Sequence, residues 1–187
     1  MKRLFAITTV VVLCSVFFFA AVCAADPATP TRPTKGSWSG STTTEPAAGD
    51  CALSGGVAEV SAEGTGVASP WGAGTWVGDP TCLFILIPAG SYVDGKQVFQ
   101  GSGTATITTA NGDEIYLVEV FTLIGNLVAP PGSATDAQGQ WTQDIDLTGG
   151  TGRFTNAYGH AFSSGVWTNN NDGTLKWEGT HTGTIEY

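Results

Sequence analysis

Short runs of alternating apolar and polar residues, separated by glycine, asparagine and aspartate, recur along the chain from about residue 35 onward. Such runs are typical of β-strands, because successive side chains of a strand point to opposite faces. No segment of this region shows sustained helical periodicity. We therefore predict eight strands, over the ranges Lys35–Thr43, Val57–Val67, Leu83–Ile87, Gln97–Thr109, Glu114–Leu123, Gln140–Leu147, Arg153–Val166 and Thr174–Tyr187.

Two turns join neighbouring strands of this set. Asn111-Gly112 and Asn171-Asp172-Gly173 tolerate the positive φ angles of tight hairpin turns. Eight strands at short, even spacing predict an all-β fold, either a small closed eight-stranded antiparallel β-barrel of the calycin type or a β-sandwich. Glycines within the strands favour the barrel, because a small barrel needs points of sharp bend. These are Gly40, Gly64, Gly101, Gly103, Gly159 and Gly183.

Two predicted strands lack a polar face. In Glu114–Leu123 one side carries Ile115, Leu117, Glu119 and Phe121, while the other carries Tyr116, Val118 and Val120. The run Leu83–Ile87 is apolar on both sides. A strand that is apolar on both faces needs a cover on its outer side. We expect either a terminal segment or a second subunit there, and favour a homo-oligomer, a dimer or a trimer.

The first residues are typical of a secretory signal peptide. Lys2 and Arg3 precede a nearly unbroken apolar run, and small residues follow it up to Ala25. We predict a signal peptide over residues 1–24, a Pro/Thr-rich linker over 25–35, and a single barrel domain over 36–187. The alternatives are an uncleaved membrane anchor and lipid attachment at Cys23, which Val22 disfavours. The mature protein is then secreted, periplasmic or on the cell surface, and makes no membrane contact.

Charge and cysteine content narrow the partners and the compartment. The formal net charge is −9 and only 12% of the residues are charged, which argues against nucleic acid or an anionic membrane as partner. After the predicted cleavage, Cys51 and Cys82 remain. An even count outside the cytosol predicts a structural disulfide between them. A reactive thiol pair is the alternative, but no basic neighbour or CxxC spacing would activate it.

The second half of the chain resembles a known family. The segments QGSGTATITTANGD at 100–113 and TGGTGRFTNAYG at 148–159, with Trp177-Glu178-Gly179-Thr180 near the end, resemble secreted bacterial proteins of the allene oxide cyclase barrel-like group. That group is similar to plant dirigent proteins and allene oxide cyclases. The resemblance implies a short eight-stranded barrel. It also implies binding of small hydrophobic molecules, whose cyclisation or coupling the plant relatives steer.

The matching segments are turns and corners, and they carry no catalytic motif. Gly149, Gly150 and Gly152 allow a sharp turn that a Cβ atom would obstruct. We expect Arg153 to bind backbone carbonyls or a neighbouring acid there, with anion or substrate binding as the alternative. Phe154 should point back into the core.

Candidate catalytic residues are few. The sequence has no GxSxG elbow, P-loop, GxGxxG or HExxH pattern, so we expect no metal and no cofactor. His160 and His181 lie on neighbouring predicted strands and could meet, although two ordinary strand histidines are the simpler interpretation. Glu119 is the one charge in an apolar run. It lies on the outside or rim, or it faces the interior as an acid of raised pKa.

The six tryptophans are the main aromatic feature. We expect most of them in the core, with Trp71 and Trp76 exposed in a glycine-rich loop. Aromatic residues along strands can also line an apolar cavity or form a sugar-binding platform. The candidate ligand-binding residues are Trp71, Trp76, Tyr116, Phe121 and Tyr158.

Three functional hypotheses remain. The first is an exported barrel that binds a small hydrophobic ligand or acts as a surface interaction module without classical catalysis. The second is a cyclase-like or dirigent-like protein that steers a reaction of an apolar substrate inside the barrel. The third is a carbohydrate-binding module. An occupied cavity favours the first two, and flat external tryptophans favour the third.

Overall fold

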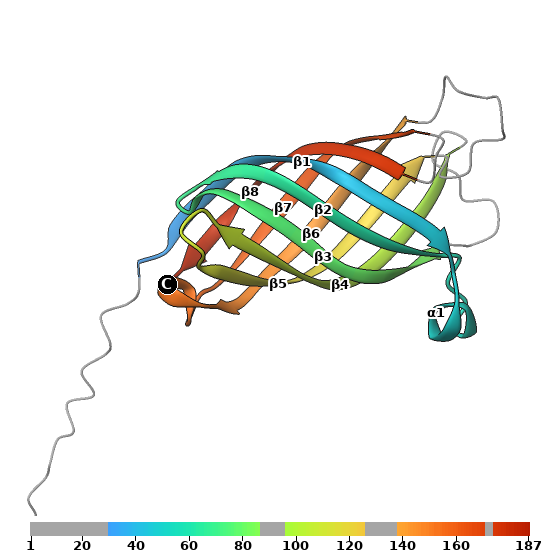
Figure 1. The fold of residues 1–187 in the computed structure, drawn as a ribbon. Coiled ribbons are helices and arrows are strands. Elements are labelled where there is room, and N and C mark those ends of the chain that lie inside the picture. The colour runs from blue at the N-terminus through green and yellow to red at the C-terminus, as the bar shows by residue number, and fades with distance from the viewer. Residues whose placement is uncertain (1–29, 87–95, 126–137, 171–173) are drawn as a thin grey trace, which may run out of the picture.

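A computed structural model describes residues 30–86, 96–125, 138–170 and 174–187. Nearly all of these residues lie in strands, joined by one short α-helix and one turn of 3₁₀-helix (Figure 1). The elements in chain order are β1 (Arg32–Pro46), α1 (Gly49–Leu53), β2 (Ala58–Ser69), β3 (Gly72–Ile85), β4 (Gln97–Thr109), β5 (Glu114–Gly125), β6 (Gln138–Gly150), η1 (Gly152–Phe154), β7 (Tyr158–Asn169) and β8 (Thr174–Glu186).

The eight strands form a closed antiparallel barrel in sequence order. Each strand pairs with the next along the chain, and β1 pairs with β8 to complete the ring (Figure 1). Closure removes both sheet edges, so no strand is left with an unpaired row of backbone groups. The predicted barrel is confirmed, and the alternative of a β-sandwich is wrong.

Three strands begin three or more positions away from the predicted start. β3 begins at Gly72, eleven positions earlier than the predicted Leu83. β7 begins at Tyr158, because the residues before it form η1 and a turn. β1 begins at Arg32 and pairs with β8 from that residue on, so the predicted domain boundary at residue 36 lies inside this strand.

One hairpin turn lies where the sequence predicted it, although Ala110 and Asn111, rather than Asn111 and Gly112, are its central residues. Asn111 and Gly112 lie in the turn between β4 and β5. Gly112 has a φ of 87°, a backbone conformation that residues other than glycine rarely adopt. The backbone N–H of Gly112 donates to the carbonyl of Thr109 at 2.9 Å and closes the turn. The second predicted turn, Asn171-Asp172-Gly173, lies outside the described residues.

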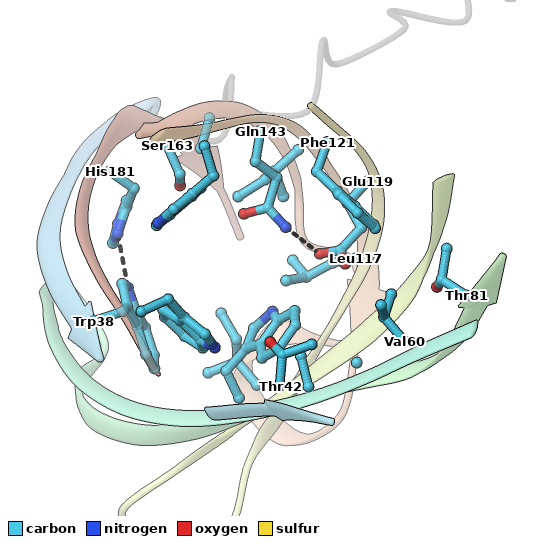
Figure 2. A pocket seen from close by; sticks show the side chains of 18 of the residues that line it. Trp38, Thr42, Val60, Thr81, Leu117, Glu119, Phe121, Gln143, Ser163 and His181 are labelled. Carbon is cyan, nitrogen blue, oxygen red and sulfur yellow. Dashed lines mark hydrogen bonds between the residues drawn. The ribbon is translucent and has the colours of Figure 1, made fainter. Parts of the chain in front are cut away.

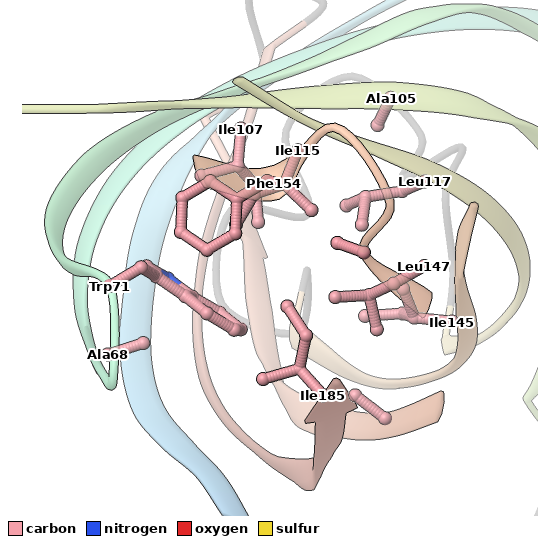
Figure 3. Close-up of a cluster of buried hydrophobic side chains, with 12 residues drawn as sticks. Ala68, Trp71, Ala105, Ile107, Ile115, Leu117, Ile145, Leu147, Phe154 and Ile185 are labelled. Atoms are coloured by element: carbon pink, nitrogen blue, oxygen red, sulfur yellow. The ribbon is translucent and has the colours of Figure 1, made fainter. Parts of the chain in front are cut away.

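One end of the barrel is filled with side chains. The cluster there is mostly aliphatic (Figure 3), with Phe154, Ile115 and Ile185 fully buried. η1 carries Phe154 over this end, as the sequence predicted for that residue. Arg153 beside it donates to the carbonyl of Trp71 at 3.3 Å and lies 3.5 Å from the carboxylate of Asp113. Arg153 therefore holds η1 against the β2–β3 and β4–β5 turns.

The opposite end carries α1 and the disulfide (Figure 1). Cys51 in α1 is bonded to Cys82 near the end of β3, with 5.5 Å between their Cα atoms. The predicted pairing is confirmed, and a disulfide is typical of proteins outside the reducing cytosol. Among the described residues no helix has the length and hydropathy to cross a membrane. The predicted signal peptide and residues 25–29 of the predicted linker lie outside the described residues, whereas the linker positions from Arg32 on belong to β1.

The outer face of β5 is apolar, as its alternation predicted. Tyr116, Val118 and Val120 are each about 40% exposed. Ile115 and Leu117, which alternate with them along the strand, point inward and are buried. No described segment of the chain covers this outer stripe. Self-association through it stays a prediction.

Candidate functional site

A cavity of about 120 Å³ lies inside the barrel, next to the filled end. One buried water needs only about 10–15 Å³ of such space, so the cavity has room for a small molecule. Its most frequent lining residue is tryptophan. All six tryptophans of the chain contribute, namely Trp38, Trp71, Trp76, Trp141, Trp167 and Trp177.

Glycines on neighbouring strands give these rings their places. A Cβ atom on Gly64 would lie 2.5 Å from the Trp177 ring, and a Cβ atom on Gly66 would lie 2.4 Å from the Trp38 ring. Side chains do not approach this closely, so the rings can lie against the strands only where the side chain is a hydrogen atom. Of the glycines predicted as bends of the barrel, Gly40 and Gly64 both lie against the Trp177 ring.

Three of the rings form perpendicular walls. Trp177 makes edge contacts with Trp76 at 5.7 Å between ring centroids and with Trp141 at 6.0 Å, at interplanar angles of 84° and 81°. Edge-to-face pairs at this separation are attractive, because the positive edge of one ring meets the negative face of the other. The result is an aromatic corner built from β3, β6 and β8.

Glu119 on β5 points into the cavity, and 3% of it is exposed (Figure 2). The side-chain amide of Gln143 on β6 donates to its carboxyl group at 2.6 Å. Burial, together with the negative charge of Asp79, raises the pKa of Glu119 to about 7. The outward placement that the sequence favoured is wrong, and the interior alternative, an acid of raised pKa, is the one the structure has.

A bulge in β3 places Asp79 at the edge of the cavity. The pairing of β3 with β4 shifts register between Gly78 and Leu83, and its pairing with β2 shifts between Gly78 and Thr81. Bulges redirect side chains and often occur beside functional sites. Asp79 in this bulge is an exposed residue, and its carboxylate accepts a hydrogen bond from the hydroxyl of Thr104, while its negative charge acts on Glu119.

His181 on β8 lines another side of the cavity (Figure 2). Its Nδ1 atom accepts a hydrogen bond of 2.8 Å from the indole N–H of Trp38, and its ring stacks on Trp71 at 5.5 Å and 5°. Burial lowers the pKa of His181 to about 4. The ring is therefore neutral at physiological pH, with its proton on Nε2.

The structure divides the sequence-predicted candidates into two groups. Phe121, Trp71, Trp76, Glu119 and His181 all line the cavity. The expected exposure of the two tryptophans is wrong, because Trp76 lies within β3 and Trp71 is only 5% exposed.

The remaining candidates lie outside the barrel. Tyr116 is 40% exposed, and its hydroxyl donates a hydrogen bond to Glu114. Tyr158 is 55% exposed, and its hydroxyl donates one to Glu186. His160 lies on the outer face, 3.0 Å from the carboxylate of Asp146. The expectation that His160 and His181 could meet is wrong, because they point to opposite faces of the wall.

Sequence reasoning missed two polar residues of the site. Gln143 is an inward position of β6, two residues after Trp141, and this spacing was a usable signal. Asp79 had no such signal, because only the bulge in β3 brings this exposed residue to the edge of the cavity. Within the described ranges, no cluster of three or more histidine, cysteine, aspartate or glutamate residues has the arrangement of a metal site.

Comparison with known proteins gives one structural similarity. No protein-family model matches the chain, and no curated protein matches it. Among solved structures, a pterocarpan synthase dirigent protein is similar, with 14% sequence identity and a TM-score of 0.44 over 84% of this chain and 86% of that one. A similarity at 14% identity gives no information about the ligand or the reaction of this chain.

Proposed function

We propose that this protein is an exported barrel that binds a small, largely apolar molecule in its tryptophan-lined cavity. The observation that carries the proposal is that all six tryptophans line one internal cavity. Small-molecule sites are usually concave and aromatic, with a few placed polar groups. Glu119 and Gln143 are such groups, and their hydrogen bond fixes the direction in which each points.

The location of the tryptophans weighs against the third hypothesis. A carbohydrate-binding module of the kind considered above presents flat aromatic rings to solvent. In the described part of the chain, the tryptophans lie in the barrel interior and none is among the exposed large hydrophobic residues. Export is supported by the disulfide and by the predicted signal peptide.

A second function, in which the barrel steers a reaction, is favoured by Glu119. A carboxyl group with a pKa of about 7 can both donate and accept a proton at neutral pH. It faces the same cavity as the neutral imidazole of His181. A bound molecule could therefore exchange a proton with Glu119 while the cavity walls fix its conformation.

Binding can be tested with the neutral fluorescent probe N-phenyl-1-naphthylamine. We expect its fluorescence to rise and the tryptophan emission to fall as it fills the cavity. Ala62 lines the cavity from β2, and Ala62→Phe should weaken binding at least tenfold by occupying the same space. The matched control Thr65→Phe lies on the outer face of the same strand and should leave binding unchanged.

Circular dichroism shows whether both variants keep the fold. Probe binding that is equal in the two folded variants would place the probe outside the barrel. No binding to the wild-type protein would also count against the proposal. Native mass spectrometry of protein secreted by its own host adds a second readout, the mass of any retained molecule.

A further inference from the structure

Charge in the cavity has one sign. Glu119 is buried in it, the exposed residue Asp79 lies at its edge, and the lining contains no lysine or arginine among the described residues. His181 contributes no positive charge, since burial keeps its ring neutral. Asp79 from β3 is the charged group that acts on Glu119, and Gln143 from β6 donates a neutral hydrogen bond. The site thus carries acidic groups that have no cationic partner within the cavity.

Aromatic rings line the cavity that Glu119 faces. Trp141 and Gln143 are successive inward positions of β6, so the amide that holds Glu119 lies next to one wall of the aromatic corner. Trp177 and Trp76 complete that corner. Tryptophan has the strongest attraction for cations among aromatic side chains, and cages of such rings recognise quaternary ammonium groups.

We propose that the cavity takes an organic cation, with an alkylated ammonium group between the tryptophan faces and the carboxylate of Glu119. This inference rests on the proposed function and names its ligand class. A buried cation must recover the loss of its hydration. Here the ring faces and the carboxylate both contribute to that recovery, and any Glu119 carboxyl group that is still protonated releases its proton to solvent as the ion pair forms.

The alternative ligand charges fit the site less well. An anion would meet Glu119 and Asp79 with no basic side chain to offset them among the described lining residues. The whole chain also has a formal net charge of −9, which attracts cations and repels anions over long range. A neutral molecule would leave Glu119 protonated, and its affinity would not depend on that proton.

Choline and 3,3-dimethylbutan-1-ol test the inference directly, because they share one shape and differ by a charged nitrogen in place of a carbon. Isothermal titration at pH 8 should show choline binding at least tenfold more tightly than the alcohol. With the pKa of Glu119 at about 7, the ionised fraction falls about tenfold from pH 8 to pH 6. Choline affinity should fall by about the same factor, while affinity for the alcohol stays constant.

Two variants locate the effect. Glu119→Gln keeps the shape of the side chain and should remove both the preference for choline and its pH dependence. Glu178→Gln removes an exposed carboxylate on β8 and should change neither. Binding of N-phenyl-1-naphthylamine to Glu119→Gln shows that the cavity of that variant remains intact.

The possible outcomes separate the two proposals. Equal or tighter binding of the alcohol would overturn the cation inference and leave the proposed function standing. Binding of N-phenyl-1-naphthylamine without binding of choline would do the same. Failure of all three molecules to bind the wild-type protein would overturn the proposed function itself.

Discussion

The same eight strands fill the two parts of the barrel interior in different ways. At the end closed by η1, aliphatic side chains and Phe154 pack into a cluster with several members fully buried (Figure 3). Farther along the barrel, tryptophan rings lie over glycines and leave a cavity that contains a carboxyl group and an imidazole. The first region is what a stable core requires, because close packing maximises contact between apolar side chains.

Stability alone does not account for the second region. Burying Glu119 costs free energy, since a hydrocarbon side chain of similar size would need no partner. The chain nevertheless places it inward and aligns it with Gln143 at 2.6 Å. The difference teaches that one end of this barrel maintains the fold, while the other holds the groups to which we assign the proposed ligand.

The largest expected effect is a difference in the free energy of unfolding between two Phe→Ala variants, one in each region. Phe154→Ala removes a fully buried ring from the filled end and should lower the free energy of unfolding by about 3–5 kcal/mol. Phe121→Ala enlarges an existing cavity and should cost less than half as much, because that ring already lacks neighbours on one side. Urea unfolding measures both values, and equal losses would show that the two regions are equally well packed.

A smaller effect should appear where glycine supports a ring. Gly64→Ala would place a Cβ atom 2.5 Å from Trp177 and 2.7 Å from the backbone oxygen of Ser39. Displacing the ring should cost about 1–3 kcal/mol and weaken binding of N-phenyl-1-naphthylamine. The adjacent outward change, Thr65→Ala, should stay within about 0.5 kcal/mol. An unchanged unfolding curve for Gly64→Ala would mean that the ring is not held against this strand.

The sequence was sufficient to predict the architecture, because each of its signals is local. Alternation within each strand, the Asn111-Gly112 turn and the two remaining cysteines depend on neighbours in the chain or on a single possible pairing. Alternation also placed Ile115, Leu117 and Glu119 on one face of β5 correctly. It did not identify the inner face, because Tyr116 and its outward neighbours are equally apolar.

The errors occur where the outcome depends on contacts across strands. The segment from Gly72 to Gly78 reads as a loop, because glycine has a low preference for strands. In the barrel it is part of β3, where Gly78 leaves space for the ring of Trp76 on the same strand. Asp79 enters the site through a bulge that no local pattern indicates.

The smallest effect is a dependence of stability on pH in which two cavity residues oppose each other. The pKa of Glu119 is raised to about 7 in the folded protein, so the folded state holds its proton more tightly and loses stability as pH rises from about 4.5 to 7. The pKa of His181 is lowered to about 4. Its contribution has the opposite sign, since the unfolded state binds the proton more tightly and stability falls as pH drops from 6.5 to 4.

Removing either side chain should reveal the pH dependence of stability that the other one contributes. In Glu119→Gln the remaining His181 makes stability fall on acidification below pH 6.5, whereas in His181→Gln the remaining Glu119 makes stability rise on acidification from pH 7. Each slope is at most about 1.4 kcal/mol per pH unit, and it is measured by urea unfolding between pH 4.5 and 7.5. The outer-face variant His160→Gln, whose side chain lies outside the cavity, is the control. Slopes of the same sign in the two cavity variants would contradict the assignment of a protonated carboxyl and a neutral imidazole, and with it the distinction between the two regions.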